Sequence, residues 1–389
     1  MIHINEKKDC CGCGACASAC PKGCISMKED AEGFLYPYIV MEDCIACGLC
    51  ERVCPVLNQR YVEDIVIPDA YAAYAKSDSL REKSSSGGLF SLIAENVLQK
   101  GGVVFGAAFD SDFSVKHIAV DNQEELGKIR GSKYLQSRTE YTFVEAKKFL
   151  DDGRLVLYTG TACQIAGLKR YLKKEYENLY TIDVLCHGVP SPKFWKKYLA
   201  EREHEYQGVV QQMFFRQKTF GWKTYSVSLK FSNSTEYRKI FKEDSFMKLF
   251  LANICLRPSC HACEFKELSR PSDITLGDCW GIDKYMPEMD DDKGTSVVLL
   301  HNEKGKKIFE ELLDKMTVKK GEIERLLPPT ADSRKSVLEH QKRKKFFKEL
   351  DRNVWGIAKL EKLIEPSWYL KAKWRLVNVL VEIKHKIVR

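Results

Sequence analysis

Two runs of cysteines near the N-terminus share one unusual spacing. Each has three cysteines at every third position, a fourth four residues further on, and then a proline: Cys10, Cys13, Cys16, Cys20 and Pro21, then Cys44, Cys47, Cys50, Cys54 and Pro55. This spacing ligates a pair of 4Fe–4S clusters, and the fourth cysteine of each run serves the other cluster. We therefore expect one cluster on Cys10, Cys13, Cys16 and Cys54, and a second on Cys44, Cys47, Cys50 and Cys20.

Structural zinc and disulfides are the alternatives for these cysteines. One zinc ion needs only four ligands and does not explain the repeated spacing. Cys11 and Cys24 lie outside the pattern and are expected to be free thiols.

Four further cysteines indicate a third metal site. The apolar residues 155–158 predict a strand, 159–164 a turn, 165–172 a helix and 181–185 a second strand. Such a crossover makes the two strands parallel, so Cys163 and Cys186 should emerge at the same edge of the sheet. Together with Cys260 and Cys263, they offer four thiolates for a third 4Fe–4S cluster.

Zinc remains an alternative at this third site because it also takes four sulfur ligands. Cys255 is a rival fourth ligand. Cys279 follows the predicted strand at 273–276, and a buried core cysteine is the simpler interpretation of it.

Two loops have residue types that suit phosphate binding. The first contains Ser85, Ser86, Gly87 and Gly88 and precedes a predicted helix over 89–99. Small residues at a helix start expose backbone N–H groups, which cradle phosphate; a serine-rich helix cap is the alternative. The second spans 131–137, and its candidate cofactor-binding residues are Ser132, Lys133, Tyr134, Gln136 and Ser137. Thr161 and Gln164, in the turn beside Cys163, complete the candidate set.

His187 and Asp278 are the candidates for proton transfer. His187 follows Cys186 directly, and histidine is the default acid–base group near neutral pH. A packing or hydrogen-bonding role is the alternative for this histidine. Asp278 lies at the end of the strand that begins near Asp273.

The order of the expected strands and helices that position these residues predicts an α+β and α/β architecture. We expect a bacterial-type dicluster ferredoxin module over 1–60, followed by a mixed α/β flavin-binding core. The core divides into 66–151 and 152–330, the latter with the third iron–sulfur site. A basic helical tail occupies 331–389. Strands are predicted at 71–75, 103–109, 115–120 and 296–300, and helices at 139–150, at 302–316 and from about residue 367.

Charge and cysteine usage limit the functional classes. The formal charge is +8, but three clusters with thiolate ligands would contribute about −6, so we expect no nucleic-acid partner. Residues 341–389 contain 14 Lys and Arg against 5 Asp and Glu. This basic charge suits contact with an acidic partner or a membrane surface. The apolar side of the predicted tail helix instead suits docking on the protein itself. Sixteen cysteines, no signal-like N-terminus and no membrane-spanning run predict the cytoplasm.

Several segments together resemble the beta subunits of the coenzyme F420 hydrogenase/dehydrogenase family, a group that includes a plant-type 7-hydroxymethyl chlorophyll a reductase. The resemblance is carried by residues 85–91, 131–134, 160–164, 186–191, 260–263 and 277–281. Two positions depart from the family pattern: Ala162 stands where proline is usual, and Cys279 where phenylalanine is frequent. Neither departure removes a ligand.

The resemblance implies an FAD, a nearby 4Fe–4S cluster and hydride exchange with a small-molecule redox substrate, either an F420-like deazaflavin or another acceptor. It also implies a redox protein partner. Two other classes stay open: an electron-transfer subunit without its own substrate, and a zinc-stabilised binding protein.

Overall fold

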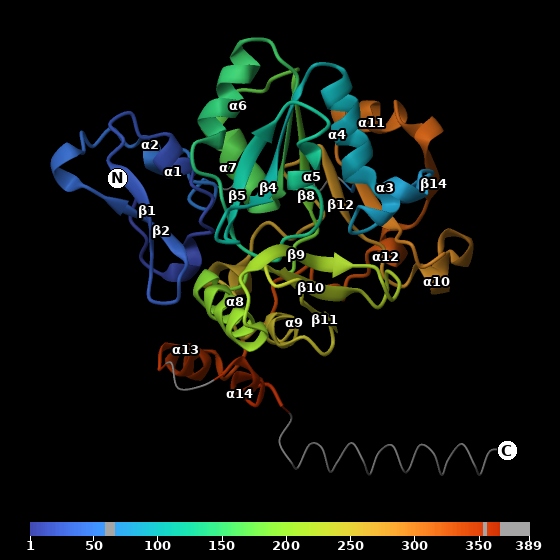
Figure 1. Cartoon of the computed structure of the whole chain (residues 1–389). Coiled ribbons are helices and arrows are strands. Elements are labelled where there is room, and N and C mark those ends of the chain that lie inside the picture. The colour runs from blue at the N-terminus through green and yellow to red at the C-terminus, as the bar shows by residue number, and fades with distance from the viewer. Residues whose placement is uncertain (59–66, 353–355, 366–389) are drawn as a thin grey trace.

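A nine-stranded mixed sheet forms the centre of the structure (Figure 1). The computed structural model describes residues 1–58, 67–352 and 356–365. The strand order is β14-β3-β13-β12-β8-β7-β4-β5-β6. In chain order the strands are β3 (Asp69–Ala75), β4 (Val103–Phe109), β5 (Val115–Val120), β6 (Ser137–Arg138), β7 (Val156–Thr161), β8 (Leu179–Val184), β12 (Ile274–Asp278), β13 (Ser296–Leu300) and β14 (Met316–Lys320).

Four central strands, β4, β7, β8 and β12, run parallel to one another. Strands β5 and β13 pair antiparallel at either side of this group. Because parallel strands point their carboxyl ends to one edge, the loops after β7, β8 and β12 meet there. The sheet therefore gathers strand ends from both parts of the predicted core at one edge.

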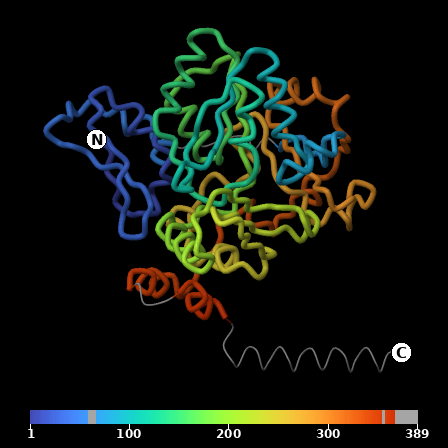
Figure 2. Tube along the Cα trace, viewed as in Figure 1, coloured from blue at the N-terminus to red at the C-terminus, as the bar shows by residue number. Residues whose placement is uncertain are grey.

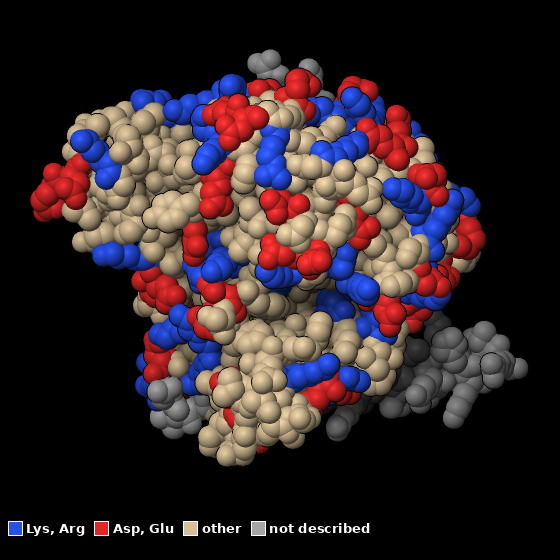
Figure 3. All heavy atoms as spheres, turned by 45° about the horizontal axis from the view of Figure 1, so that its top comes forward, with Lys and Arg blue, Asp and Glu red and all other residues tan. Residues whose placement is uncertain are grey.

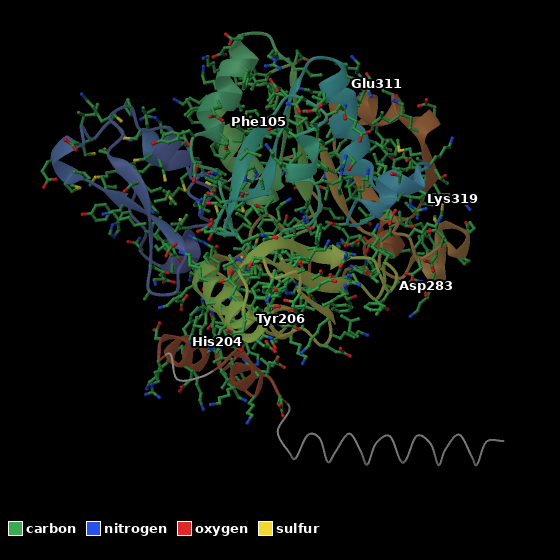
Figure 4. The ribbon with its side chains drawn as sticks, in the orientation of Figure 1. Phe105, His204, Tyr206, Asp283, Glu311 and Lys319 are labelled. Atoms are coloured by element: carbon green, nitrogen blue, oxygen red, sulfur yellow. The ribbon has the colours of Figure 1, made fainter. Side chains whose placement is uncertain are left out.

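Helices cover both faces of the sheet (Figures 1 and 2). One face packs against α4 and α11, and the other against α6 and α7. Phe105 of β4 points to the α6–α7 side (Figure 4), where its ring stacks on Tyr158 with centroids 5.2 Å apart. The helices of the core are α3 (Asp78–Glu82), α4 (Leu89–Gln99), α5 (Leu126–Ile129), α6 (Thr142–Asp151), α7 (Ala162–Leu172), α10 (Ile282–Tyr285), α11 (Glu303–Glu310) and α12 (Ile323–Leu326), with the short 3₁₀ helices η3 (Pro258–Ala262), η4 (Pro287–Met289) and η5 (Leu313–Lys315).

The N-terminal module lies beside the α6–α7 face (Figure 1). Its elements are η1 (Lys7–Asp9), α1 (Ala15–Ser18), β1 (Ile25–Glu29), β2 (Leu35–Ile39), η2 (Met41–Asp43) and α2 (Leu49–Arg52). Gly167 of α7 permits a close approach, because a Cβ there would lie 2.9 Å from the sulfur of Cys13. The cysteine loops of the module are thus packed directly against the helix that begins at the edge of the sheet.

A second sheet forms a separate layer below the first in Figure 1. It has the order β11-β10-β9 and packs with α8, α9, α13 and α14 around a large aromatic core. His204 and Tyr206, labelled in Figure 4, belong to α8 of this layer. The elements are α8 (Pro192–Tyr206), β9 (Val210–Gln217), β10 (Ser226–Phe231), β11 (Glu236–Ile240), α9 (Ser245–Leu251), α13 (Arg343–Asp351) and α14 (Ile357–Glu361).

The mixed α/β architecture with an N-terminal cluster module agrees with the expectation from sequence, and so does the parallel β7–α7–β8 unit. Three helix predictions need correction. The helix predicted over 139–150 begins at Thr142, and the helix predicted over 165–172 begins at Ala162, within the predicted turn at 159–164. The helix predicted over 302–316 ends at Glu310. This last error arises because Met316 starts β14, which pairs with the distant strand β3.

The predicted tail helix from about residue 367 lies outside the described residues. Lys and Arg are interspersed with Asp and Glu over the face drawn in Figure 3. In the described ranges, every helix is too short or too polar to cross a bilayer.

Candidate functional site

A cavity of about 430 Å³ opens at the carboxyl edge of the parallel strands. Residues that follow β7 and β8 line it together with the end of β12. The loops at 84–88 and 130–137 form another part of its wall, and residues 8, 9, 11 and 12 of the N-terminal module reach it as well. This is the edge at which open α/β sheets bind ligands.

All four cysteines of the predicted third site line this cavity. Cys163 is the second residue of α7, and the side chains of Thr161 and Gln164 form a capping box around it. The Thr161 hydroxyl lies 3.1 Å from the Cys163 sulfur. Cys186 follows β8, whereas Cys260 lies in η3 and Cys263 just after it. The fold therefore brings together thiols from three distant segments.

The surroundings of these thiols disfavour a bare thiolate. Burial raises the pKa of Cys186 to about 12, and it also raises the pKa of Cys260 and Cys263. A metal centre is the usual means of holding such cysteines deprotonated. Among the described residues, no three His, Cys, Asp or Glu side chains are close enough together to hold a single ion. A 4Fe–4S cluster spaces its four thiolates more widely than one zinc ion does, because four irons lie between them.

The cysteines of the N-terminal module form two neighbouring groups. A small cavity, separate from the one at the sheet edge, is lined by Cys20, Cys44, Cys47 and Cys50, and Cys47 is exposed. In the other group, thiolates at Cys10 and Cys54 would both act on the Cys16 thiol. Cys24 touches the Cys20 sulfur at 3.3 Å. Each group draws its members from both sequence runs, as the exchanged fourth cysteine requires.

Ser85, Ser132 and Lys133 join the two predicted phosphate loops at the cavity wall. The Ser132 backbone N–H donates to the Ser85 hydroxyl at 2.7 Å. The ammonium of Lys133 donates to the carbonyls of Arg130 and Gly131, at 2.9 and 3.2 Å. Burial lowers the pKa of Lys133 to about 7. The loops thus present hydroxyls and a cation held only by neutral groups, which suits an anionic ligand.

The other candidate cofactor-binding residues line the cavity, but several of them already form hydrogen bonds within the protein. Ser86, Gly88, Tyr134, Gln136, Ser137, Thr161 and Gln164 all line the cavity. Several of their polar groups are engaged within the protein: Gln164 donates to the Ser137 carbonyl, and the Ser137 hydroxyl bonds His117 at 2.7 Å. These residues shape the wall as well as offering groups to a ligand.

Gly87 is placed differently from the expectation. It does not line the cavity among the residues described. Its N–H donates to the Ser296 hydroxyl at 3.0 Å, and a Cβ there would lie 2.6 Å from the Ala73 carbonyl oxygen. This glycine lets the loop pack against β3 and β13.

His187 and Asp278 both face the cavity, but their partners differ. The His187 Nε2 lies 2.7 Å from the Asn253 amide oxygen and its Nδ1 3.4 Å from Asp332. Burial lowers the pKa of His187, against the opposing effect of Asp332. Asp278 forms an ion pair with the buried Arg216 and accepts from the Trp222 indole N–H at 2.9 Å. The ion pair and the indole hydrogen bond thus engage both side-chain oxygens of Asp278, so His187 is the better placed of the two to exchange a proton.

Cys255 and Cys279 lie away from the cavity. Cys255 is fully buried in the aromatic core of the second layer, and Cys279 is 1% exposed in the cluster around Trp222. Neither lines the cavity described above.

Sequence reasoning missed several residues of the site. The Cys11 thiol lines the cavity, and the thiols of Cys13 and Cys163 are close enough to influence its pKa, which burial raises as well. His117 and Lys266 also line it, and the ammonium of Lys266 donates to the His187 carbonyl at 2.8 Å. For Cys11, the sequence contained one signal. It is adjacent to Cys10 but does not fit the ligand spacing, which indicates a separate role for its thiol.

Comparison with known protein families gives three matches. Residues 9–58 match a 4Fe–4S dicluster domain. Residues 70–141 match the N-terminal domain of the coenzyme F420 hydrogenase/dehydrogenase beta subunit, and residues 153–325 match its C-terminal domain. The last two matches together span more than half of the chain.

Among solved structures, the chain is similar to one chain of the F420-reducing NiFe hydrogenase complex from Methanosarcina barkeri, studied as a xenon derivative. The two share 17% identity with a TM-score of 0.47, over 77% of this chain and 93% of that chain. The search of curated proteins gave no match.

The family matches agree with the cysteine spacing and with the architecture around the cavity. They make this chain an iron–sulfur redox protein. The chain belongs to the coenzyme F420 hydrogenase/dehydrogenase beta subunit family and has an N-terminal 4Fe–4S dicluster domain.

Proposed function

We propose that this protein is an iron–sulfur flavoprotein oxidoreductase. It passes electrons between 4Fe–4S clusters and FAD and exchanges a hydride with a small-molecule substrate. One observation carries the proposal: a single cavity is lined by four cysteines, by the two serine- and lysine-bearing loops, and by the cysteine loop of the module.

Three clusters form the electron route in this proposal. Cys20, Cys44, Cys47 and Cys50 hold the outer cluster, and Cys10, Cys13, Cys16 and Cys54 hold the cluster nearer the core. Cys163, Cys186, Cys260 and Cys263 hold a third cluster at the cavity. The close packing of Cys13 on α7 supports this order, because α7 carries Cys163 at its start.

Ser85, Ser132 and Lys133 are the residues that would hold the phosphates of FAD. Lys133 fits this role because its partners are two neutral carbonyls, so a phosphate would supply the missing negative charge. The bound flavin would supply the chemistry that links one-electron transfer to hydride transfer. The chain's own residues position it and keep its phosphates in place.

His187 is the residue we assign to proton exchange at the cavity. Its Nε2 position is fixed by Asn253, which holds the ring in one orientation. Asp278 orients the wall through Arg216 and Trp222. The substrate class is a planar redox compound, either an F420-like deazaflavin or another small acceptor.

The exposed end of the module is where we place the redox protein partner. Cys47 is exposed there, beside the exposed side chains of Met41 (56%) and Ile45 (58%). A cluster that is open to the surface can exchange single electrons with another protein. The basic tail remains a candidate contact for an acidic partner or a membrane surface, and the cytoplasm remains the expected location.

Anaerobic purification with metal and flavin analysis tests the proposal. We expect a brown protein with about twelve irons and one FAD per chain, from three clusters. About eight irons with one zinc would move the third site to zinc. A full set of irons without flavin would make the chain an electron-transfer subunit and overturn the enzymatic proposal. Zinc without iron would leave only the binding-protein alternative.

A further inference from the structure

Arg257 is a fully buried cation whose partners are all neutral. It is 0% exposed. Its Nε donates to the Cys10 carbonyl at 2.9 Å, its Nη1 to the Gln136 amide oxygen at 3.1 Å, and its Nη2 to the Leu35 carbonyl at 2.9 Å. The guanidinium also lies 4.3 Å from the ring centroid of Tyr36. Each of the three nitrogens of the side chain therefore donates a hydrogen bond, and none of these partners is a carboxylate.

The other buried arginines of the described chain are paired differently. Each forms an ion pair with a carboxylate: Arg81 with Asp291, Arg202 with Glu201, Arg216 with Asp278, Arg270 with Asp183 and Arg343 with Glu32. Burying a charge without an opposite charge costs several kcal/mol, on the order of the cost of a broken buried ion pair. Among the described residues, Arg257 thus lacks the carboxylate partner that each of the other buried arginines has.

Arg257 lies where the module meets the cavity. It contacts Cys10 and Leu35 of the module on one side, and on the other its carbonyl accepts from the backbone N–H of Cys260. Thiolates at Cys10 and Cys260 are among the charges that act on it. A Cβ at Gly12 would come within 2.9 Å of its Nη1, so the ligand loop of the module packs tightly on the guanidinium.

A 4Fe–4S cluster with four thiolate ligands has a net negative charge, about −2 when oxidised and one unit more negative when reduced. We infer that this charge, on the cluster of Cys10, Cys13, Cys16 and Cys54, is the missing counter-charge of Arg257. The arginine holds the cluster loop against the cavity wall and makes that cluster easier to reduce. It is a positioning residue for electron transfer between the module and the cavity.

The sign of the effect follows from Coulomb's law. A fixed positive charge stabilises the more negative, reduced cluster, so it raises the reduction potential. The outer cluster, on Cys20, Cys44, Cys47 and Cys50, serves as an internal reference, because none of these cysteines is a hydrogen-bond partner of Arg257 or lines the cavity at the sheet edge. The inference rests on the proposed cluster route but does not require FAD.

Two substitutions separate charge from shape. Arg257→Gln keeps a hydrogen-bonding side chain but removes the charge, and Arg257→Lys keeps the charge but loses the fork of donors. Arg343→Gln is the matched control, because Arg343 also ties the module to the core, through Glu32, yet has its own carboxylate.

The measurement is a redox titration of the full-length, iron-loaded protein followed by electron paramagnetic resonance. We expect the potential of the inner cluster to become more negative in Arg257→Gln, with the outer cluster unchanged, and to stay near the wild-type value in Arg257→Lys and Arg343→Gln. Unchanged potentials in iron-loaded Arg257→Gln would overturn the inference, and so would an equal shift in Arg343→Gln.

A loss of iron is also informative. If Arg257→Gln loses the inner cluster while Arg257→Lys keeps it at the wild-type potential, the charge is needed to hold the cluster, as inferred. If both variants lose it, the role is one of shape, and the inference is wrong. A missing flavin or a zinc at the third site would instead count against the proposed function, so the two failures are distinguishable.

Discussion

Lys133 is the side chain that would give the proposed phosphate site its preference for anions. Its ammonium is held by two carbonyls, without a carboxylate among its hydrogen-bond partners in the described structure. Burial lowers its pKa to about 7, so near neutral pH the free protein contains both the charged and the neutral amine. A phosphate bound beside it would favour the charged form. Binding of the anion and of a proton are therefore linked.

This linkage gives a pH dependence with a definite sign. Above about pH 7 the free protein must take up a proton to bind the anion, so affinity for FAD should fall as pH rises, by up to about tenfold per unit. Lys133→Met should remove the dependence and weaken binding by about 1.5–3 kcal/mol, the contribution of a charged hydrogen bond. Fluorescence titration of flavin-depleted protein measures both. Lys76→Met is the control, since Lys76 donates to the Asp314 carbonyl away from the cavity. An affinity that rises with pH would contradict this assignment.

At the scale of elements, the loop before α4 depends on packing against the sheet. Gly87 lies between β3 and β13, where an added Cβ would be 2.6 Å from the Ala73 carbonyl and 3.0 Å from the Ser296 nitrogen. Both neighbours are backbone atoms of the sheet, and they cannot move without disturbing strand pairing. The positions of Ser85 and Ser86 at the cavity therefore rest on this glycine indirectly.

Gly87→Ala should consequently lower the free energy of unfolding by about 1–3 kcal/mol, as overpacking of a tight site does. Gly127→Ala in α5 is the matched control, because nothing lies within 4 Å of its added Cβ; it should change stability little. Chemical denaturation of the two variants measures the difference. If Gly87→Ala were as stable as Gly127→Ala but lost its flavin, the glycine would serve the phosphate directly.

The sequence indicated elements well where local pattern decides them. Strands β4 and β5 and helix α4 occupy the predicted ranges, since their apolar residues alternate or repeat at the period of the element. Gly87 and Met316 show why other expectations differed. Ser296, the partner of Gly87, is 209 residues away, and Met316 becomes a strand residue only by pairing with Ala75 of β3. Likewise, Cys11 approaches Cys163 of the core, and Arg257 bonds Cys10 and Leu35 of the module, only when the module docks on the core.

At the scale of the whole molecule, the N-terminal module contains two groups of cysteines, an outer group and an inner group that is packed against the core. The inner group packs on α7 through Cys13, and Arg343 further ties the module to the core through Glu32. The outer group lines a separate cavity together with the exposed side chain of Ile45. In the proposed electron route, this arrangement would give electrons one surface at which to enter or leave and one interior site at which to react.

The outer end of the module should therefore control exchange with a protein but not with a small dye. Ile45 is 58% exposed, next to Cys44 in the ligand loop. Ile45→Glu places a charge on this apolar surface, so it should slow electron transfer from a reduced bacterial-type ferredoxin several-fold, because apolar contact area is lost and a charge must be desolvated. Reduction by methyl viologen, which needs no docking surface, should keep its wild-type rate. Val209→Glu is the control, since Val209 is similarly exposed, at 65%, but lies beside β9 of the second layer. Stopped-flow absorbance of iron-loaded proteins measures the rates, and equal slowing by both variants, or slowing with viologen as well, would contradict an electron port at this end.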